Sequence, residues 1–176
     1  MNYKKIVFKF LVYGLWMVGW MVGSLLLISY FIGPVVWWNF SPSAPEGIYI
    51  YAPDQTLHAG DWAIVKLPVD VPPLHKSHRM LKQVQGFPAE VYEVTESHLV
   101  FRNRNYPVSG KKTLPHLLPG TYVIEKGSLL FLNDPDISFD SRYLGQISKE
   151  NVLCKVHLLF TFNAMSSFFD FRRSKP

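Results

Sequence analysis

The sequence is poor in cysteine. Cys154 is the only one among its 176 residues, so an internal disulfide is excluded, and no Cys and His spacing typical of a zinc site occurs. We therefore expect no metal and no cofactor, and we expect the folded part to be stabilised by packing. With 15% aromatic and 18% charged residues, the composition also excludes a disordered chain, because such chains bury too little apolar surface to fold.

Charge is scarce in the middle of the chain and concentrated at its two ends. Six basic residues lie at these ends: Lys4, Lys5, Lys9, Arg172, Arg173 and Lys175. Between them the basic and acidic residues nearly balance, although the formal net charge of the whole chain is +5. A nucleic-acid-binding domain needs a basic face on its folded body, so we expect no nucleic-acid partner.

The longest stretch without charge runs from residue 10 to residue 45. Its first part, Phe10 to Ile32, is almost wholly apolar and would be about 35 Å long as an α-helix, enough to cross a hydrocarbon core of roughly 30 Å. We predict a transmembrane helix. The alternative is a cleavable signal peptide, but its apolar stretch is usually only about 7–15 residues long, so we favour an uncleaved anchor.

The flanks of this run predict its orientation. The basic residues before Phe10 favour a cytoplasmic N-terminus, and Trp37 and Trp38 suit the opposite interface. We therefore expect a single-pass protein of the cytoplasmic (inner) membrane. Its predicted parts are a cytoplasmic basic flank (1–9), a transmembrane anchor (10–33), an extracytoplasmic, periplasmic β-rich domain (36–170) and a basic C-terminal tail (171–176).

The rest of the chain predicts a mostly β, antiparallel domain. Short β-branched and aromatic runs alternate with Gly, Pro, Asn and Asp, as in all-β proteins. The predicted strands are 48–51, 62–65, 90–94, 97–101, 121–124, 128–132 and 152–160. The proline-containing segments 69–78 and 102–120 are predicted to be loops.

A segment rich in serine and proline follows the predicted anchor. Pro42 and Pro45 restrict φ on either side of Ser43, and Gly47 permits a sharp turn into the next strand. Such a segment can hold the Ser43 hydroxyl at a defined height above the membrane. The alternative is an ordinary turn, which is the commoner role of such clusters.

Lys82 lies in a stretch of alternating apolar residues. On the inward face of a strand a lysine loses hydration, which disfavours the ammonium and lowers the lysine pKa. A neutral amine near working pH can then act as a general base. The alternative is a solvated surface lysine, which is the usual environment of this residue type.

A third polar segment contains Ser138, Asp140 and Arg142. If this segment is extended, the three side chains point to one face, where Asp140 can pair with Arg142 and Ser138 can bond an incoming group. The alternative is an Asp-rich calcium loop. The segment lacks the Gly and the terminal Glu of an EF-hand, which disfavours metal binding.

The order of these motifs resembles that of a known family. After the anchor come Ser41-Pro42-Ser43-Ala44-Pro45, Gly60-Asp61-Trp62-Ala63-Ile64-Val65, Lys82-Gln83-Val84-Gln85-Gly86-Phe87-Pro88 and Ser138-Phe139-Asp140-Ser141-Arg142-Tyr143-Leu144-Gly145. This series resembles the type I signal peptidases, which are membrane-bound Ser/Lys endopeptidases, over about residues 10 to 147. It is most similar to the TraF-type peptidases of conjugative transfer, because one residue separates Ser43 from the next proline and a Pro-x-Gly-x-Tyr continuation follows.

The resemblance implies a signal-peptidase-like fold and a role for each site residue. Ser43 matches the nucleophile, Lys82 the general base, Ser41 an oxyanion-hole hydroxyl, Ser138 the serine that orients the lysine amine, and Asp140 with Arg142 a supporting ion pair. Two departures from the family pattern are Leu132-Asn133-Asp134 in place of Gly-Asp-Asn and Ala89-Glu90 in place of Gly-Asp. They put the shape of the loops in doubt more than the chemistry.

The resemblance also implies a function and partners. The implied activity is removal of the signal segment from exported precursor proteins, in the conjugative branch a pilin precursor whose ends some members join into a ring. The implied partners are the membrane, this precursor and components of a transfer or secretion apparatus. The alternatives are a general signal peptidase for bulk secreted proteins and a non-catalytic, membrane-anchored assembly subunit. A Ser-His-Asp triad is disfavoured, because no nucleophile-elbow signature occurs.

Overall fold

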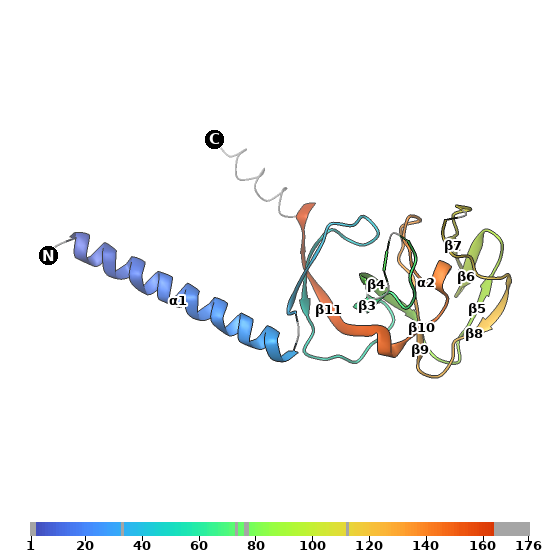
Figure 1. Cartoon of the computed structure of the whole chain (residues 1–176), viewed down its shortest axis with the longest axis horizontal. Helices are drawn as coiled ribbons and strands as arrows, with labels where there is room; N and C mark the ends of the chain where they lie inside the picture. The colour runs from blue at the N-terminus through green and yellow to red at the C-terminus, as the bar shows by residue number, and fades with distance from the viewer. Residues whose placement is uncertain (1–2, 33, 73, 76–77, 112, 164–176) are drawn as a thin grey trace. The chain divides into compact units, whose positions relative to one another are not determined.

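The chain divides into two compact units between residues 37 and 38. Figure 1 shows a computed structural model, which describes residues 3–32, 34–72, 74–75, 78–111 and 113–163. The predicted C-terminal tail, 171–176, and the end of the predicted β-domain lie outside the described residues. Each unit is described by itself below.

The described residues form one long helix, two β-sheets and two short helical turns. In chain order the elements are α1 (Tyr3–Ile32), β1 (Val36–Asn39), β2 (Gly47–Tyr51), β3 (Trp62–Lys66), β4 (Arg79–Gly86), β5 (Val91–Val94), β6 (His98–Phe101), β7 (Arg104–Pro107), β8 (Gly120–Val123), β9 (Ser128–Phe131), α2 (Ser141–Leu144), β10 (Ile147–Ser148), the 3₁₀ turn η1 (Lys149–Asn151) and β11 (Val152–Thr161).

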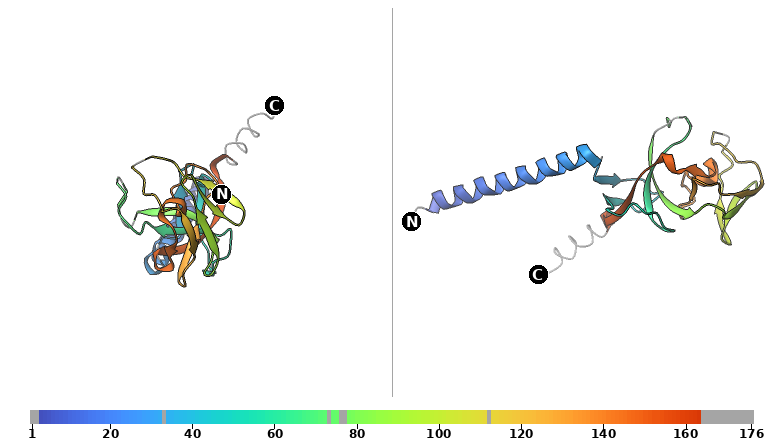
Figure 2. Two further views of the ribbon diagram at one scale, coloured as in Figure 1. Left: turned by 90° about the vertical axis from the view of Figure 1, so that its right-hand side faces the viewer. Right: turned by 90° about the horizontal axis from the view of Figure 1, so that it is seen from below.

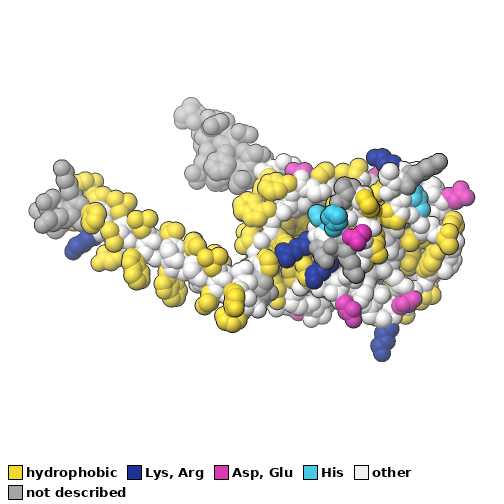
Figure 3. Space-filling model, in the orientation of Figure 1, with side chains coloured by type: hydrophobic (Ala, Val, Ile, Leu, Met, Phe, Trp, Pro, Cys, Tyr) yellow, Lys and Arg dark blue, Asp and Glu magenta, His cyan; other side chains and the backbone are white. Residues whose placement is uncertain are grey.

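Helix α1 begins earlier than the apolar run predicted. It starts at Tyr3 and continues without a break to Ile32. Of the helices in the described part of the chain, only this one is long and apolar enough to cross a membrane, over Ile6–Phe31. Figure 3 shows apolar side chains, in yellow, along its length. By its length and composition, α1 can therefore anchor the chain in a membrane.

The larger sheet has seven strands in the order β1-β2-β11-β3-β4-β9-β10. Its pairings from β2 to β10 are antiparallel. The late strand β11, orange in Figure 1, lies between two early strands, β2 and β3. The mostly β, antiparallel fold and the seven predicted strands are confirmed, with ends that differ by one or two residues.

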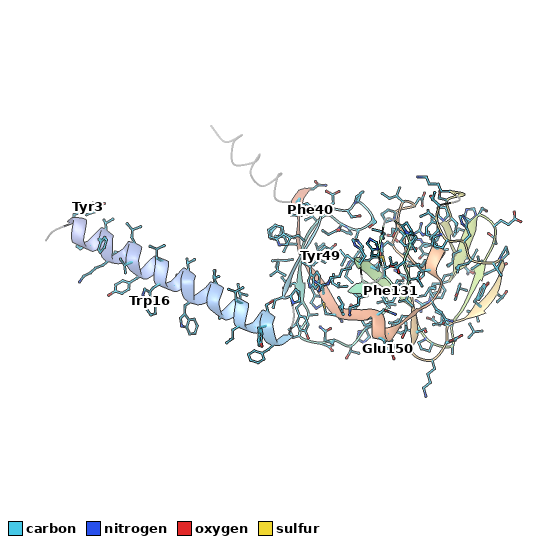
Figure 4. All side chains as sticks on the ribbon, in the orientation of Figure 1. Tyr3, Trp16, Phe40, Tyr49, Phe131 and Glu150 are labelled. Atoms are coloured by element: carbon cyan, nitrogen blue, oxygen red, sulfur yellow. The ribbon has the colours of Figure 1, made fainter. Side chains whose placement is uncertain are left out.

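The smaller sheet has the order β7-β6-β5-β8 and is also antiparallel. It lies at the end of the domain away from β2 (Figures 1 and 2). Strand β9 serves both hydrophobic cores, because successive side chains of a strand point to opposite faces. Leu129 and Phe131 pack into the core of the larger sheet, while Leu130 and Leu132 pack against the smaller one. Phe131 is fully buried and is labelled in Figure 4.

Gly86 ends β4 at the point where the two cores meet. A Cβ atom at this position would lie 2.6 Å from Ile124 Cδ1 and 2.9 Å from Phe101 Cζ, closer than side chains pack. The pairing of β4 with β9 shifts register between Val84 and Gly86. A residue without a side chain is therefore needed here for the strand to pass between the sheets.

The prediction of a continuous loop over 102–120 is wrong at its start. Residues Arg104–Pro107 form β7, which pairs with β6 through a two-residue turn at Arg102 and Asn103. Both turn residues have positive φ, 47° and 60°, as the twist of a tight hairpin requires. The usual Asn-Gly or Asp-Gly signal is absent from this turn, so the sequence pattern did not reveal the hairpin.

The extended conformation considered for 138–142 is also wrong. Asp140 is the N-cap of helix α2, and its carboxylate accepts a hydrogen bond from the backbone N–H of Arg142. An aspartate at this position satisfies a helix N–H that would otherwise lack a partner, which favours the helix over a strand. Ser138 and Arg142 therefore do not alternate along a strand.

Candidate active site

One pocket of about 230 Å³ in the β-domain brings together residues from distant parts of the sequence. Ser41 and Ser43 come from the turn after β1, and Lys82 comes from β4. The remaining lining residues are Asn39, Leu74, His78, Arg79, Met80, Leu81, Ile137 and Phe139. The pocket therefore combines two hydroxyls and an amine with a wall of both apolar and polar side chains.

Lys82 lies on the inward face of β4. Burial alternates along this strand, so that Met80, Lys82 and Val84 are buried while Leu81 and Gln83 are only half-buried. Only 3% of the Lys82 side chain is exposed. This is the environment that the alternating apolar residues around Lys82 predicted.

The amine of Lys82 is held by a hydroxyl group. Lys82 Nζ donates a hydrogen bond of 3.0 Å to Ser138 Oγ, and Ser138 is itself fully buried. Burial lowers the pKa of Lys82 from its ordinary 10.5 to about 8, because the ammonium loses hydration. Two nearby charges act on this pKa in opposite directions: the charge of Asp140 raises it, and the charge of Arg142 lowers it.

Asp140 and Arg142 form a fully buried ion pair. Arg142 Nε lies 2.9 Å from Asp140 Oδ1, and Arg142 Nη2 lies 3.2 Å from Asp140 Oδ2. The backbone N–H of Arg142 also donates to Asp140 Oδ1. Two buried charges with several hydrogen bonds hold the segment that carries Ser138 in one conformation.

The two serines after β1 bond to each other. Ser41 Oγ and Ser43 Oγ lie 2.9 Å apart, and the backbone N–H of Ser43 donates to Ser41 Oγ over 3.4 Å. Ser43 is half-buried and Ser41 is exposed. The Ser43 hydroxyl thus opens on the pocket that Lys82 lines, while its hydrogen bond goes to Ser41.

The turn that carries these serines is held by Asn39. Asn39 Oδ1 accepts from Ser41 N at 3.2 Å, and Asn39 Nδ2 donates to the carbonyl oxygens of Ser41, Ala44 and Pro45 at 2.9–3.1 Å. The hydroxyl of Tyr49, labelled in Figure 4, also donates to Pro45 O at 2.8 Å. The shape of the turn is therefore fixed by polar side chains as well as by its prolines.

Comparison with known proteins identifies the family. A family model described as "Signal peptidase, peptidase S26" matches residues 7–161, which include most of α1, both serines, Lys82 and the buried ion pair. The chain belongs to this family. It is therefore a member of the S26 serine peptidases, of the signal peptidase type.

Two other comparisons add little. A solved structure, a signal peptidase I from Enterococcus faecalis, is 18% identical, with a TM-score of 0.39, and the match covers 58% of this chain and 97% of that one. The family assignment does not depend on this likeness. Comparison with curated proteins gives no match.

The pocket of this S26 family member gathers the residues that the sequence singled out. Ser41, Ser43 and Lys82 line it directly. Ser138 reaches it through its bond to Lys82, and the Asp140–Arg142 pair lies behind Ser138. Among the described residues, His78 also lines the pocket, but the hydrogen bond of the Ser43 hydroxyl goes to Ser41 and not to this histidine.

Sequence reasoning did not assign a role to Asn39 or Asn133. Asn39 precedes the serines and carried no motif. Asn133 was noted only as a departure from the family pattern, yet it is fully buried and bonds to the backbone of Ser43 and of β4. A polar side chain at the end of an apolar strand is a weak signal, and its partners are distant in sequence.

Neither the pocket nor its surroundings offers a set of metal ligands. Within the described ranges, no group of three or more His, Cys, Asp or Glu side chains is placed to hold a metal ion. The carboxylate of Asp140 is already engaged with Arg142. The polar side chains that line the pocket are two hydroxyls, one amide, the amine of Lys82, the imidazole of His78 and the guanidinium of Arg79. The hydroxyls and the amine suit nucleophilic and proton-transfer chemistry.

Proposed function

We propose that this protein is a membrane-anchored serine endopeptidase that removes signal segments from exported precursor proteins, with Ser43 as nucleophile and Lys82 as general base. One observation carries the proposal: a buried amine with a pKa of about 8 lines the same pocket as the Ser43 hydroxyl. At pH 7 roughly a tenth of such an amine is neutral, far more than of a solvated lysine. A neutral amine can accept the proton of a serine hydroxyl.

The first step is acylation of Ser43. The hydroxyl leaves its hydrogen bond with Ser41 and turns into the pocket that Lys82 lines. Oγ then attacks the carbonyl carbon of the scissile peptide while Lys82 Nζ takes its proton. The new Oγ–C bond gives a tetrahedral oxyanion. When the C–N bond breaks, Lys82 returns the proton to the leaving amine.

The oxyanion needs hydrogen-bond donors. The hydroxyl of Ser41 becomes available to donate when the Ser43 hydroxyl turns away from it. The backbone N–H of Ser43 is a second donor, and it exchanges its long 3.4 Å bond to Ser41 Oγ for a bond to the oxyanion. Ser138 keeps the Lys82 amine directed while its proton moves, and the Asp140–Arg142 pair holds the segment of Ser138. Neutral Lys82 then activates water, which releases the cleaved peptide from Ser43.

The substrate follows from the location. Helix α1 lies within the membrane, with its basic flank in the cytoplasm and the β-domain outside the cytoplasmic membrane. Ser43 lies 11 residues beyond the end of α1 in the sequence. A site tethered in this way meets the extracytoplasmic end of a signal segment as that segment leaves the membrane.

Within this class, the substrate that we propose is a pilin precursor of a conjugative transfer system. The support comes from sequence: a single residue, Ala44, separates Ser43 from Pro45, and the Pro-x-Gly-x-Tyr continuation ends at Tyr49. If Ser43 instead attacks a peptide bond near the C-terminus of the pilin, the leaving amine belongs to a C-terminal peptide and the acyl group on Ser43 is the pilin itself. The amine of the pilin's own N-terminus can then take this acyl group in place of water. The ester bond then breaks, an amide bond forms, and Ser43 regains its proton from Lys82, which gives a cyclic product.

The decisive test replaces the two reacting groups in the full-length protein. Ser43→Ala and Lys82→Ala, assayed in membranes that contain the precursor, are expected to abolish cleavage, whereas the exposed-site controls Ser97→Ala and Lys126→Ala are expected to cleave normally. Normal processing by either active-site variant, with normal protein levels, would show that the dyad is wrong and would favour a non-catalytic assembly subunit.

A second experiment defines the substrate range. In cells that carry Ser43→Ala as the only copy of the protein, we expect one precursor, the pilin, to accumulate uncleaved. Accumulation of many secreted precursors would instead identify a general signal peptidase. Mass spectrometry of the mature pilin separates the two fates of the acyl group, because a cyclic product is lighter than the linear one by one water.

A further inference from the structure

We propose that Asn133 is a positioning residue that sets the distance between Ser43 and Lys82. The inference rests on the proposed function, because it concerns the same two groups. Asn133 does not line the pocket and touches no reacting atom. It acts through the main chain on which the nucleophile and the base are mounted.

The Asn133 amide joins these two pieces of main chain directly. Its Nδ2 donates a 2.7 Å hydrogen bond to the carbonyl oxygen of Ser43, and its Oδ1 accepts a 2.8 Å hydrogen bond from the backbone N–H of Gln83. A third contact, of 3.4 Å, links Nδ2 to Leu81 O. Leu81 and Gln83 are the two neighbours of Lys82. One side chain therefore bonds the main chain of Ser43 and the main chain on both sides of Lys82.

This bridge spans segments that are not adjacent in the sheet. The turn of Ser43 leads into β2, Lys82 is on β4, and β11 and β3 lie between these strands. Asn133 is 90 residues from Ser43 and 50 from Gln83 in the sequence. A bond across that separation fixes the turn relative to β4 directly. The strand pairing alone connects them only through two intervening strands.

The shape of the turn does not require Asn133. Asn39 already bonds the N–H of Ser41 and the carbonyl oxygens of Ser41, Ala44 and Pro45, and Tyr49 donates a second bond to Pro45 O. The bond from Asn133 to Ser43 O therefore fixes the position of the turn relative to β4, not the conformation of the turn itself. Misplacement of a reacting group by about 1 Å can lower a rate by about 100-fold, so such placement has a catalytic consequence.

Asn133 is itself rigidly held. Its backbone N–H donates to Asp140 Oδ2 at 3.0 Å, its carbonyl oxygen accepts from Arg142 Nη2 at 2.6 Å, and the residue is fully buried. The buried ion pair thus supports both sides of the site. It holds the segment that carries Ser138, whose hydroxyl bonds Lys82, and it holds Asn133, whose side chain bonds Ser43.

The bridge requires an amide. A carboxylate at position 133 could still accept from Gln83 N but could not donate to Ser43 O, and it would place a negative charge near Lys82. A nearby negative charge favours the ammonium and raises the lysine pKa. Asn133 therefore supplies a donor and an acceptor without a charge.

The test compares Asn133→Ala and Asn133→Asp with wild type as full-length protein in detergent, assayed on the precursor below the unfolding temperature of each variant. For Asn133→Ala we expect kcat to fall at least about 10-fold and KM to change less than about 2-fold, because the dyad is misplaced while the pocket is intact. The midpoint of the pH–rate profile stays near 8, since Lys82 remains buried. For Asn133→Asp we expect a lower kcat and a midpoint shifted to higher pH.

Asn105→Ala and Asn105→Asp are the matched controls, because Asn105 is an exposed asparagine on β7. They are expected to match wild type in kcat, KM and pH midpoint. The positioning role is wrong if Asn133→Ala keeps the wild-type kcat per folded molecule. It is also wrong if the pH midpoint of this variant moves toward 10.5, which would indicate that the core around Lys82 has opened. If Asn133→Ala does not fold, the isosteric Asn133→Asp replaces it in the test. A wild-type kcat in Asn133→Asp would then show that the positioning role is wrong.

Ser43→Ala, run alongside, separates this inference from the proposed function. If Ser43→Ala is inactive and the Asn133 variants are unimpaired, the dyad stands and only the role of Asn133 fails. If Ser43→Ala cleaves the precursor at the wild-type rate, the proposed function itself fails.

Discussion

Lys82 and Ser138 lie 56 residues apart in the sequence and meet in a buried hydrogen bond of 3.0 Å. The partner of the amine is thus a neutral hydroxyl, so no direct ion pair offsets the loss of hydration on burial. Burial consequently dominates the pKa of Lys82 and lowers it to about 8.

The rate of cleavage should rise with pH and level off above about 8. The reaction requires the neutral amine, whose fraction increases roughly 10-fold per pH unit below a pKa of about 8. Measurement of kcat/KM between pH 6 and 10 tests this. A rate that is flat over this range, or that rises only near 10.5, would contradict a lysine base of lowered pKa.

Replacement of Lys82 by Met should stabilise the fold against unfolding while abolishing activity. Between pH 8 and 10.5 the unfolded lysine binds a proton that the folded one does not, so the penalty for burying Lys82 is fully present below pH 8 and disappears by about 10.5. A shift of this size corresponds to about 3 kcal/mol in the free energy of unfolding.

The measurement is denaturant unfolding of both proteins in detergent at several pH values. The stability advantage of Lys82→Met over wild type should shrink as the pH rises from 8 to 10.5. The exposed-site control Lys126→Met should show no such trend. An advantage that is constant with pH would mean that Lys82 is not buried as an ammonium at neutral pH.

Replacement of Ser138 by Ala should lower kcat by about 10- to 100-fold. The amine loses the hydroxyl that directs it, while the pocket and the binding of substrate are unchanged. Because burial is the main cause of the lowered pKa of Lys82, the pH midpoint should stay near 8. A variant with full activity would show that Ser138 does not orient the amine.

Removal of one partner of the buried ion pair should destabilise the protein more than removal of both. Arg142→Met leaves the charge of Asp140 without a partner in the core, which should reduce the free energy of unfolding by about 3–5 kcal/mol. The double variant Asp140→Asn/Arg142→Met should recover part of this loss. Thermal unfolding of the full chain measures both, and equal losses would contradict a strongly coupled pair.

Arg142→Met should also reduce activity at pH 7. The unopposed charge of Asp140 raises the pKa of Lys82, and the positive charge that lowers it is gone. The fraction of neutral amine at pH 7 therefore falls, and the pH–rate profile should move to higher pH. An unmoved profile would show that the two charges have little effect on Lys82.

The basic N-terminal flank should determine the orientation of α1. Protease added to spheroplasts is expected to digest the β-domain of wild type, because in the topology that we propose this domain lies outside the cytoplasmic membrane. Replacement of Lys4, Lys5 and Lys9 by Gln should reduce the accessible fraction, since positive charge favours the cytoplasmic side. Protection of the wild-type β-domain in intact spheroplasts would reverse the proposed topology.

The elements that the sequence predicted well have local signals. The apolar run within α1 requires only composition and length, and the strands of the β-domain follow from alternation and from turn residues. The errors occur where the conformation of a segment does not follow from the usual residue pattern. The hairpin at Arg102 and Asn103 lacks the usual turn residues, and the carboxylate of Asp140 caps α2 in a segment whose residue pattern is equally compatible with a strand.

The amino-acid sequence by itself determined the apolar anchor and the β character of the domain, because these depend on residue type and spacing along the chain. It also gave the candidate dyad, through the resemblance of its ordered motifs to a known family. The tertiary structure alone decided how Ser43, Lys82 and Ser138 come together, and it revealed that Asn133 bonds the main chain of Ser43 and of β4. Placing β11 between β2 and β3 brings Ser43 and Lys82 to one pocket, and Ser138 bonds Lys82 from beside it. The physical reason is that a lowered lysine pKa and a hydrogen bond across 90 residues are properties of packing, which no local pattern encodes.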